Sequence, residues 1–306
     1  MLLRDRTALS HLVPAAPFCL LTFSPLSCLA LPMLLLLSPA KSLNYDTPVP
    51  AHLPHTLPAF PGQSAALIAL LRGHSPQTLA ALMKLSDPLA ALNVARYAAW
   101  RPEAGTATGN GNGNNSHGNA RQALLAFNGG VYAALDAHTL SHADLQWAQQ
   151  HLMILSGLYG VLRPLDLVQP HRLEMGTRLA TPAGQSLYQF WGTRIAEHLN
   201  TALAASAPAS GTAPVVLNLA SQEYFRAVDR TTLKARVVDC VFEDWTSGAY
   251  KVIGIHAKRA RGLMARHCTV QRVTTPQALT AFAAEGYAFD SSASSADRMV
   301  FRRRSA

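Results

Sequence analysis

Basic side chains are concentrated in one short segment near the carboxyl-terminal end of the sequence. A helix that begins near Lys258 would place Lys258 and Arg261 on one face, and Arg259 and Arg266 on another. Several lysines and arginines on one surface bind phosphate groups and release counterions, which makes binding depend steeply on salt. The alternative is a charged surface that contacts only water. We expect Lys41, Arg163 and Arg172 to join this cluster in the folded chain.

A second set of polar residues lies where predicted strands end. Lys41 follows the apolar run Met33–Leu37, while Asn218, Ser221 and Glu223 lie at or just after the run Val215–Leu219. Ligands of open α/β sheets bind at the carboxyl ends of the strands, so these residues are candidates for a catalytic site. A lysine in a cleft of low dielectric can lose its proton and act as a nucleophile or base.

Three roles for Lys41 are open on the sequence alone. Phosphate binding ranks first, an ion pair with Glu174 ranks second, and catalysis ranks third, as a glycosylase-like or lyase-like reaction on a base or sugar. The sequence has no Ser-His-Asp, metal-ligand or phosphate-loop motif that would specify a reaction. We expect neither a metal nor a cofactor, and the sequence leaves enzymatic activity undecided.

Residues 75–100 have the pattern of a helical hairpin. The sequence predicts a first helix over Pro76–Lys84, a tight connection over Leu85–Leu89 and a second helix over Ala90–Trp100. A helix-hairpin-helix unit of this kind offers backbone N–H groups to a DNA phosphate. The alternative is a hairpin that only packs in the core. The nucleic-acid-binding candidates in this segment are Lys84, Ser86, Asn93 and Arg96.

Apolar runs and helical periodicity predict a mixed α/β (α+β) fold. The predicted strands are Met33–Leu37, Leu124–Phe127, Val215–Leu219, Val237–Phe242, Tyr250–His256 and Met299–Phe301, and Leu152–Leu155 is a further short apolar run. The further predicted helices are Gln63–Arg72, His142–Leu152, Leu187–Asn200 and Pro276–Ala284. Their irregular alternation favours a single domain over residues 33–306, with a central sheet, surrounding helices and the hairpin attached. We expect Arg302–Arg304 to be a frayed basic end.

The composition restricts the class of protein. The chain has 306 residues, of which 49% are hydrophobic, so it can bury a large core. Lys and Arg number 26 against 17 Asp and Glu, and the formal net charge of +9 favours nucleic acid or an anionic membrane as a partner. The four cysteines form no CxxC pair, and the twelve histidines are scattered, so no zinc or redox site is indicated.

Two segments are expected to lie outside the folded core. Residues 1–32 have the basic start and apolar composition of a signal peptide, but prolines interrupt the apolar stretch, which is too short to span a membrane. We expect Met33 to be the initiator and residues 1–32 to be a non-native or disordered extension; a secreted or membrane-associated protein is the alternative. Residues 104–119 are rich in Gly and Asn, which is typical of a flexible insertion.

Six stretches of sequence, occurring in one order, carry a family resemblance. They are LSPAKSLNY (Leu37–Tyr45), LMKLSDPLAALNVARY (Leu82–Tyr97), LSGLYGVLRPLDLVQPHRLEMG (Leu155–Gly176), LYQFWG (Leu187–Gly192), LNLASQEYF (Leu217–Phe225) and AKRARGLMAR (Ala257–Arg266). Together they resemble the bacterial YaaA family of peroxide-stress-associated, DNA-binding proteins.

The resemblance implies a compact α/β domain with a positively charged cleft, located in the cytoplasm. It also implies a role in protecting DNA under hydrogen peroxide stress, with duplex or bubble-containing DNA as the partner. We expect the protein to be a monomer that does not bind membranes. Two positions depart from the family pattern: Gly130 replaces its usual Asp, and the hairpin contains Ala90-Ala91 in place of the common Ala-Gly.

Overall fold

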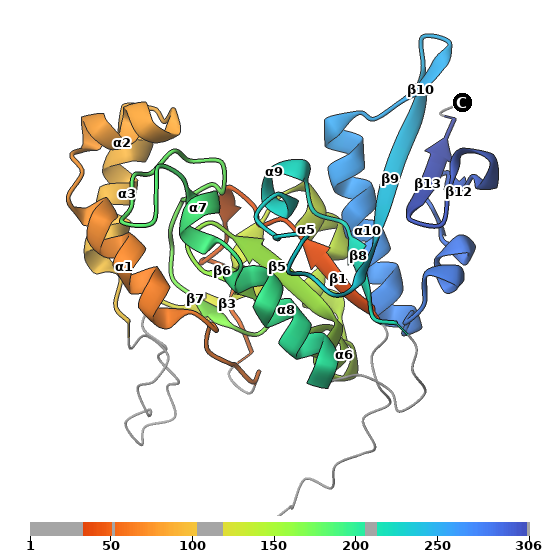
Figure 1. The fold of residues 1–306 in the computed structure, drawn as a ribbon, viewed down its shortest axis with the longest axis horizontal. Coiled ribbons are helices and arrows are strands. Elements are labelled where there is room, and N and C mark those ends of the chain that lie inside the picture. The colour runs from red at the N-terminus through yellow and green to blue at the C-terminus, as the bar shows by residue number, and fades with distance from the viewer. Residues whose placement is uncertain (1–32, 51–52, 103–118, 206–212, 305–306) are drawn as a thin grey trace, which may run out of the picture.

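The computed structural model describes residues 33–50, 53–102, 119–205 and 213–304. The predictions for residues 1–32 and for most of the 104–119 insertion therefore lie outside the described residues. Within the described part, the chain forms a nine-stranded sheet with the order β11-β12-β13-β9-β8-β1-β5-β6, and β10 pairs with β9. Helices lie on both sides of this sheet, which confirms the predicted mixed α/β class (Figure 1).

Five neighbouring strands in the middle of the sheet are parallel. They are β13 (Arg298–Arg303), β9 (Arg236–Thr246), β8 (Val215–Asn218), β1 (Met33–Leu37) and β5 (Leu152–Ser156). Antiparallel strands extend the sheet at its sides, namely β6 (Gly160–Leu162), β10 (Ala249–Lys251), β11 (Ala283–Ala284) and β12 (Tyr287–Phe289). Because the five central strands are parallel, their carboxyl ends share one edge of the sheet, and this edge carries the candidate site.

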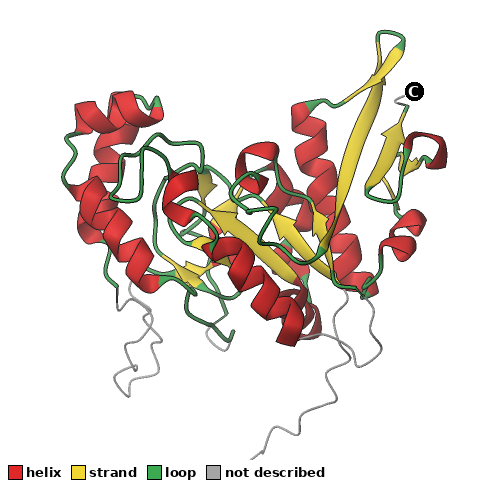
Figure 2. Ribbon diagram, viewed as in Figure 1, coloured by secondary structure: helices red, strands yellow, loops and turns green. Residues whose placement is uncertain are grey.

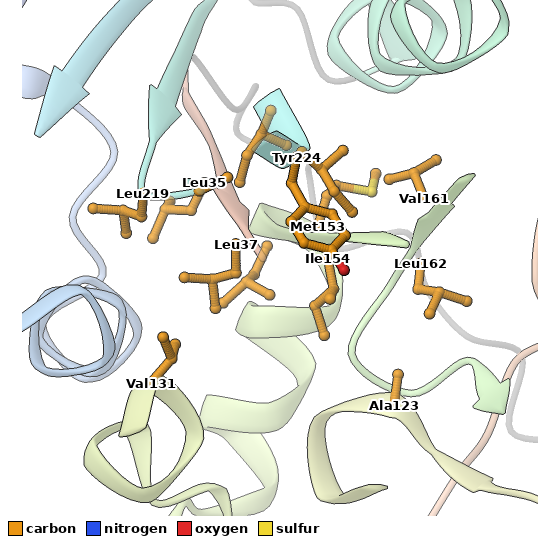
Figure 3. Close-up of a cluster of buried hydrophobic side chains, with 14 of the residues drawn as sticks. Leu35, Leu37, Ala123, Val131, Met153, Ile154, Val161, Leu162, Leu219 and Tyr224 are labelled. Atoms are coloured by element: carbon orange, nitrogen blue, oxygen red, sulfur yellow. The ribbon is translucent and has the colours of Figure 1, made fainter. Parts of the chain in front are cut away.

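Strand β1 is the centre of the hydrophobic core. All five of its side chains are buried, as expected for an apolar run with both faces covered. Leu35 and Leu37 meet Met153 and Ile154 of β5 in a cluster that also contains Val131 (Figure 3). The predicted strands at Met33–Leu37 and Val215–Leu219 are therefore confirmed, and the apolar run Leu152–Leu155 lies in β5, which pairs in register with β1.

Three helices lie close to the central strands. Helix α8 (Arg194–Ala205) crosses in front of the sheet in the view of Figure 1, whereas α6 (His142–His151) and α10 (Gly254–Gln271) lie behind it. Helix α10 packs closely on the short helix α5 (Gly130–Leu135) at Gly262, where an added Cβ would lie 2.0 Å from the carbonyl oxygen of Val131. This close packing brings the amino-terminal turn of α5 beside the basic face of α10.

Helices α1 (Pro61–Arg72), α2 (Pro76–Met83) and α3 (Asp87–Ala99) form a separate group at one end of the molecule (Figure 2). The connection between α2 and α3 is shorter than predicted, because α3 already begins at Asp87 rather than at Ala90. At the other end of the view lie the long strand β9, its partner β10 and the last strands.

Short elements complete the fold. Two small ladders pair β2 (Ser42–Leu43) with β4 (Phe127–Asn128), and β3 (Arg121–Gln122) with β7 (Leu167–Val168). The short helices are α4 (Ala123–Ala126), α7 (Leu187–Trp191) and α9 (Gln222–Phe225), and the 3-10 turns are Ala137–Thr139, Pro276–Ala281 and Ser291–Ala293. Among the described residues, no helix is long and apolar enough to cross a membrane.

Several predicted elements are wrong in detail. Leu124–Phe127 is mostly helix α4 rather than a strand, and the predicted helix Leu187–Asn200 is split at Gly192, which has a φ of 50°. Only the start of Tyr250–His256 is a strand, since α10 begins at Gly254. The predicted final helix Pro276–Ala284 is a 3-10 turn followed by strand β11.

The basic end at Arg302–Arg304 is not frayed. Arg302 and Arg303 belong to β13 and pair with β9, and their guanidinium groups form ion pairs with Glu243 and Asp244. The regular pairing with β9 and these ion pairs order the end of the chain, which the local sequence does not reveal.

Candidate functional site

A pocket of about 410 Å³ opens at the carboxyl edge of the parallel strands. Strands β1 and β8 are adjacent and parallel, so the residues that follow them, Ser38–Ser42 and Leu219–Ser221, meet at this edge. The start of α5, the start of α9, Glu174 and the basic face of α10 complete the wall. The lining residues are Ser38, Pro39, Ala40, Lys41, Ser42, Asn128, Gly129, Gly130, Val131, Tyr132, Glu174, Leu219, Ser221, Glu223, Tyr224, Lys258 and Arg261.

Ser38 ties the two strand ends together. Its Oγ accepts a hydrogen bond from the backbone N–H of Ser221 at 2.8 Å and donates one to the Ser221 Oγ at 3.2 Å. The carbonyl oxygen of Ser38 accepts a hydrogen bond from the hydroxyl of Tyr132 at 2.9 Å. These bonds fix two hydroxyl groups and the backbone around them at the pocket wall.

Lys41 and Glu174 form an ion pair across one side of the pocket. The Lys41 Nζ lies 2.8 Å from the Glu174 Oε2, and the Arg172 guanidinium binds the other carboxylate oxygen at 2.9 Å. Burial by itself would raise the pKa of Glu174, but the hydrogen bonds from Lys41 and Arg172 outweigh it and hold this pKa below its ordinary value. Glu174 is therefore ionised at neutral pH and occupied by two cations.

Glu223 supplies the second carboxylate of the pocket. Its Oε1 accepts a hydrogen bond from the backbone N–H of Gly176 at 2.9 Å, and its backbone carbonyl accepts one from the Tyr188 hydroxyl at 3.0 Å. A Cβ added at Gly176 would lie 3.0 Å from the same Oε1, so glycine permits this close approach. The carboxylate is held in place at one oxygen.

Lys258 and Arg261 provide the cationic side of the pocket. They lie one turn apart on α10 and both line the cavity, as the helical spacing predicts. Among the described residues, neither side chain has an acidic partner, and the Arg261 Nε is buried without a hydrogen-bond acceptor. Burial lowers the pKa of Arg261 from its ordinary value, and the nearby Cys240 acts in the opposite direction. The pocket thus combines two uncompensated positive charges with two engaged carboxylates.

Gly130 faces this cationic side. A Cβ built on Gly130 would lie 3.6 Å from the Lys258 Cβ, which is an ordinary van der Waals contact. The aspartate that the family pattern places here would therefore lie beside Lys258. Its absence leaves the lysine without that acid in this chain.

Two further predicted site residues lie close to the pocket but do not line it. Arg172 reaches it only through its ion pair with Glu174. The Asn218 side chain donates a hydrogen bond to the Asp239 Oδ1 at 2.8 Å and accepts one from the Ala220 N–H at 3.0 Å. Asn218 therefore holds the end of β8 against β9 and shapes the turn that leads to Ser221.

Three predicted cations do not join the cluster. Arg163 follows the end of β6 that lies away from the pocket edge, and it pairs there with Asp166. Arg259 forms an ion pair with Glu285 at 2.5 Å. Arg266 donates hydrogen bonds to the carbonyl oxygens of Leu135 and Asp136, which lie at the end of α5. The last two residues hold α10 against its neighbours.

The hairpin residues have different surroundings. Lys84 and Ser86 are exposed in the connection between α2 and α3, and Lys84 has a φ of 53°. Asn93 is completely buried and donates a hydrogen bond to the carbonyl oxygen of Leu89, so its amide is not on a surface that DNA could contact. Arg96 is half-buried near Tyr45 and Arg172. The hairpin is tied to the pocket wall by a hydrogen bond from the Tyr97 hydroxyl to the carbonyl oxygen of Arg172.

The sequence interpretation missed two contributors to this region. Tyr132 is buried, and its hydroxyl supports Ser38; the turn Asn128–Gly130 just before it was a visible sign that α5 begins at the site. His171 lies behind the pocket beside Lys41 and Arg172, and burial lowers its pKa to about 4, so it is neutral at pH 7. His171 lies within the stretch Leu155–Gly176 that carries the family resemblance, but the interpretation of that stretch assigned it no role.

Among the residues that the structure describes, no group of three or more His, Cys, Asp or Glu side chains lies close enough together to hold a metal ion. The two cysteines in this part of the chain, Cys240 and Cys268, are buried and unpaired.

Comparison with known proteins gives one consistent result. The family described as peroxide stress protein YaaA matches residues 33–293. A UPF0246 protein of Paracidovorax citrulli is 62% identical over 274 residues, covering 90% of this chain and 100% of the relative. UPF0246 proteins of Verminephrobacter eiseniae and Bordetella petrii are 62% and 60% identical, each over 89% of this chain and at least 99% of the relative. The chain belongs to the peroxide stress protein YaaA family.

Proposed function

We propose that this protein binds DNA as part of the peroxide stress response, using the cationic pocket edge and the adjoining helical hairpin. The observation that carries the proposal is the pair Lys258 and Arg261, which face the pocket without an acidic partner among the described residues. Cations left unpaired in a recess attract an anion, and phosphate is the anion that DNA presents. The net charge of +9 adds long-range attraction to the same partner.

The placement of the hairpin supports a shared binding surface. Tyr97 near the end of α3 is bonded to the segment that carries Arg172 and Glu174, so the hairpin and the pocket wall are in contact. Ser86 lies at the start of the same helix, about 16 Å away along its axis. Exposed Lys84 beside it would contact a phosphate well away from the pocket, whereas Asp87 in the first turn of α3 weakens phosphate binding at the helix terminus itself.

DNA binding by the full chain can be measured by fluorescence anisotropy across a salt series. We expect the logarithm of the binding constant to fall linearly with the logarithm of salt concentration. Replacing Lys258 by Ala should reduce the magnitude of the slope by about one unit, since one phosphate contact is lost. Lys234→Ala is the matched control, because it removes an exposed lysine just before β9, at the opposite edge of the sheet. No saturable binding at low salt would reject the proposal.

An enzymatic function in the same pocket is the second candidate, and the Lys41–Glu174 pair is the observation behind it. The Lys41 Nζ is engaged by the Glu174 carboxylate at 2.8 Å and is therefore not free to attack a substrate as a nucleophile. The geometry therefore supports the ion pair with Glu174, the second of the roles predicted for Lys41, over catalysis. The Lys41→Met variant separates DNA binding from catalysis as the function of the pocket. If Lys41 only helps to bind DNA, the variant should lose a modest part of the DNA affinity. If Lys41 is catalytic, the variant should still bind DNA but should no longer convert a base or sugar.

A further inference from the structure

The buried cation of the pocket calls for a specific ligand. Arg261 has its Nε shielded from solvent with no acceptor among the described residues, and Lys258 lies one turn away on the same side of α10. A buried charge without a partner costs stability, so its retention in a pocket indicates that an anionic group completes it. A phosphate fits, because it can accept hydrogen bonds from a guanidinium and an ammonium at the same time.

Other lining residues of the pocket are suited to neutral hydroxyl groups. Ser38 and Ser221 are fixed there by their mutual hydrogen bonds, and Glu223 has one oxygen engaged by Gly176. Carboxylates and hydroxyls at the carboxyl ends of parallel strands bind the hydroxyls of sugars in other α/β proteins. Glu174 is already occupied by two cations and is not available for this role.

The size of the pocket excludes a bare phosphate as the complete ligand. Its volume of about 410 Å³ lies within the range of small-molecule pockets. Apolar side chains also line the pocket, among them Pro39, Val131 and Leu219, and provide a surface for a flat base. A base pair within a stacked duplex cannot enter a recess of this size, whereas one unpaired nucleotide can.

We propose that the pocket binds a single nucleotide unit, with its phosphate on Lys258 and Arg261 and its sugar toward Ser221 and Glu223. The inference rests on the proposed function in that DNA is the principal source of the nucleotide. An unpaired nucleotide in a DNA strand and a free nucleoside monophosphate both present a phosphate, a sugar and a base, and only the free monophosphate also presents an unesterified 3′-hydroxyl. The helical hairpin would hold the neighbouring DNA backbone while the unpaired nucleotide occupies the pocket.

The test compares three ligands on the full chain: a duplex, the same duplex with a central bubble, and each free deoxynucleoside 5′-monophosphate. We expect the bubble to bind about tenfold more tightly than the duplex, the gain given by one additional charge-assisted contact. At least one monophosphate should displace the bubble, while inorganic phosphate displaces it more weakly because it lacks the sugar and base.

Variants assign the preference to the pocket. Arg261→Met removes the buried charge at similar length, and its melting temperature should not fall below that of the wild type. The Arg261→Met variant should bind the bubble and the duplex with affinities within about twofold of each other. Lys258→Ala is at an exposed position and does not endanger folding, and it should reduce the preference for the bubble only in part. Lys234→Ala should leave this preference unchanged.

The outcomes separate the two proposals. Equal binding of bubble and duplex, with no competition by any monophosphate, would overturn the pocket inference and leave DNA binding intact. Absence of all DNA binding would remove the proposed function; Arg261-dependent binding of a free monophosphate would then identify the free nucleotide as the ligand. A bubble preference that survives in both Arg261→Met and Lys258→Ala would place the unpaired nucleotide elsewhere on the protein.

Discussion

Gly130 and Lys258 meet where the first turn of α5 touches the basic face of α10. Because Gly130 has no side chain, it places no acid beside Lys258, which faces the pocket. A Cβ at position 130 would fit without displacing Lys258. A single substitution can therefore change the charge of the pocket and leave its shape intact.

Gly130→Asp should form an ion pair with Lys258 and weaken the binding of bubble-containing DNA by about fivefold to tenfold, because the lysine then has a competing partner. Gly130→Asn has nearly the same size without the charge and serves as the matched control. Anisotropy titrations at one salt concentration measure both. Equal effects of Asp and Asn would show that bulk, and not charge, acts at this position.

The structure brings five of the predicted site residues together in one pocket: Lys41, Ser221, Glu223, Lys258 and Arg261. The reasoning succeeded for them because strand ends and helical spacing are local properties of the sequence. It failed where a distant group decides the role of a side chain. Arg259 pairs with Glu285, and Arg266 binds carbonyl oxygens at the end of α5; neither partner can be recognised from the basic segment alone.

Among the elements, helix α10 positions the site through its contact with α5. Gly262 is the point of closest approach, and any larger residue there must push the two helices apart. Since Lys258 and Arg261 lie on the turns just before Gly262, their distance from the start of α5 depends on this contact.

Gly262→Ala should lower the free energy of unfolding by about 1–3 kcal/mol, because its Cβ would clash with the carbonyl oxygen of Val131. Gly254→Ala, at the start of the same helix, has no atom within 4 Å of the new Cβ and should change stability by no more than about 0.5 kcal/mol. Urea unfolding of both variants checks the difference. Similar stability of the two would mean that α5 can move away at little cost.

Prediction of elements from the sequence worked best for short, wholly apolar strands. It failed at Tyr250–His256, where Val252 and Ile255 belong to a largely apolar segment of strand length. Both side chains are exposed, at 54% and 74%, because they lie outside the core where β10 ends and α10 begins. Apolar alternation indicates a strand only where a second layer covers one face, and that layer is a property of the whole fold.

At the scale of the molecule, burial of neutral histidines couples folding to pH. His171 packs against Tyr159 and Phe127, and its Nδ1 donates a hydrogen bond to the carbonyl oxygen of Gln169, while His151 stacks on Trp147. Burial lowers the pKa of each to about 4, from an ordinary value of 6.5. Between these values the unfolded chain binds more protons than the folded chain, so stability is present above pH 6.5 and is lost as the pH falls toward 4.

His171→Phe should therefore reduce the pH dependence of the free energy of unfolding between pH 6.5 and 4. One histidine contributes a slope of about 1.4 kcal/mol per pH unit in this window, and the variant should lack that contribution whatever its absolute stability. Urea unfolding at four or five pH values measures the slope for variant and wild type. Identical slopes would show that His171 takes up a proton in the folded protein as readily as in the unfolded one.

The position of β1 has a consequence for how the protein is made. It is the first described strand to leave the ribosome, yet both of its neighbours, β5 and β8, are synthesised much later. The pocket needs residues from Ser38 through to Arg261, so it cannot exist on a nascent chain until helix α10 has emerged. Pairings between such distant segments form slowly and leave apolar strands exposed in the meantime. Strand β1 therefore stays without its partner strands on the nascent chain until β5 and then β8 have been synthesised.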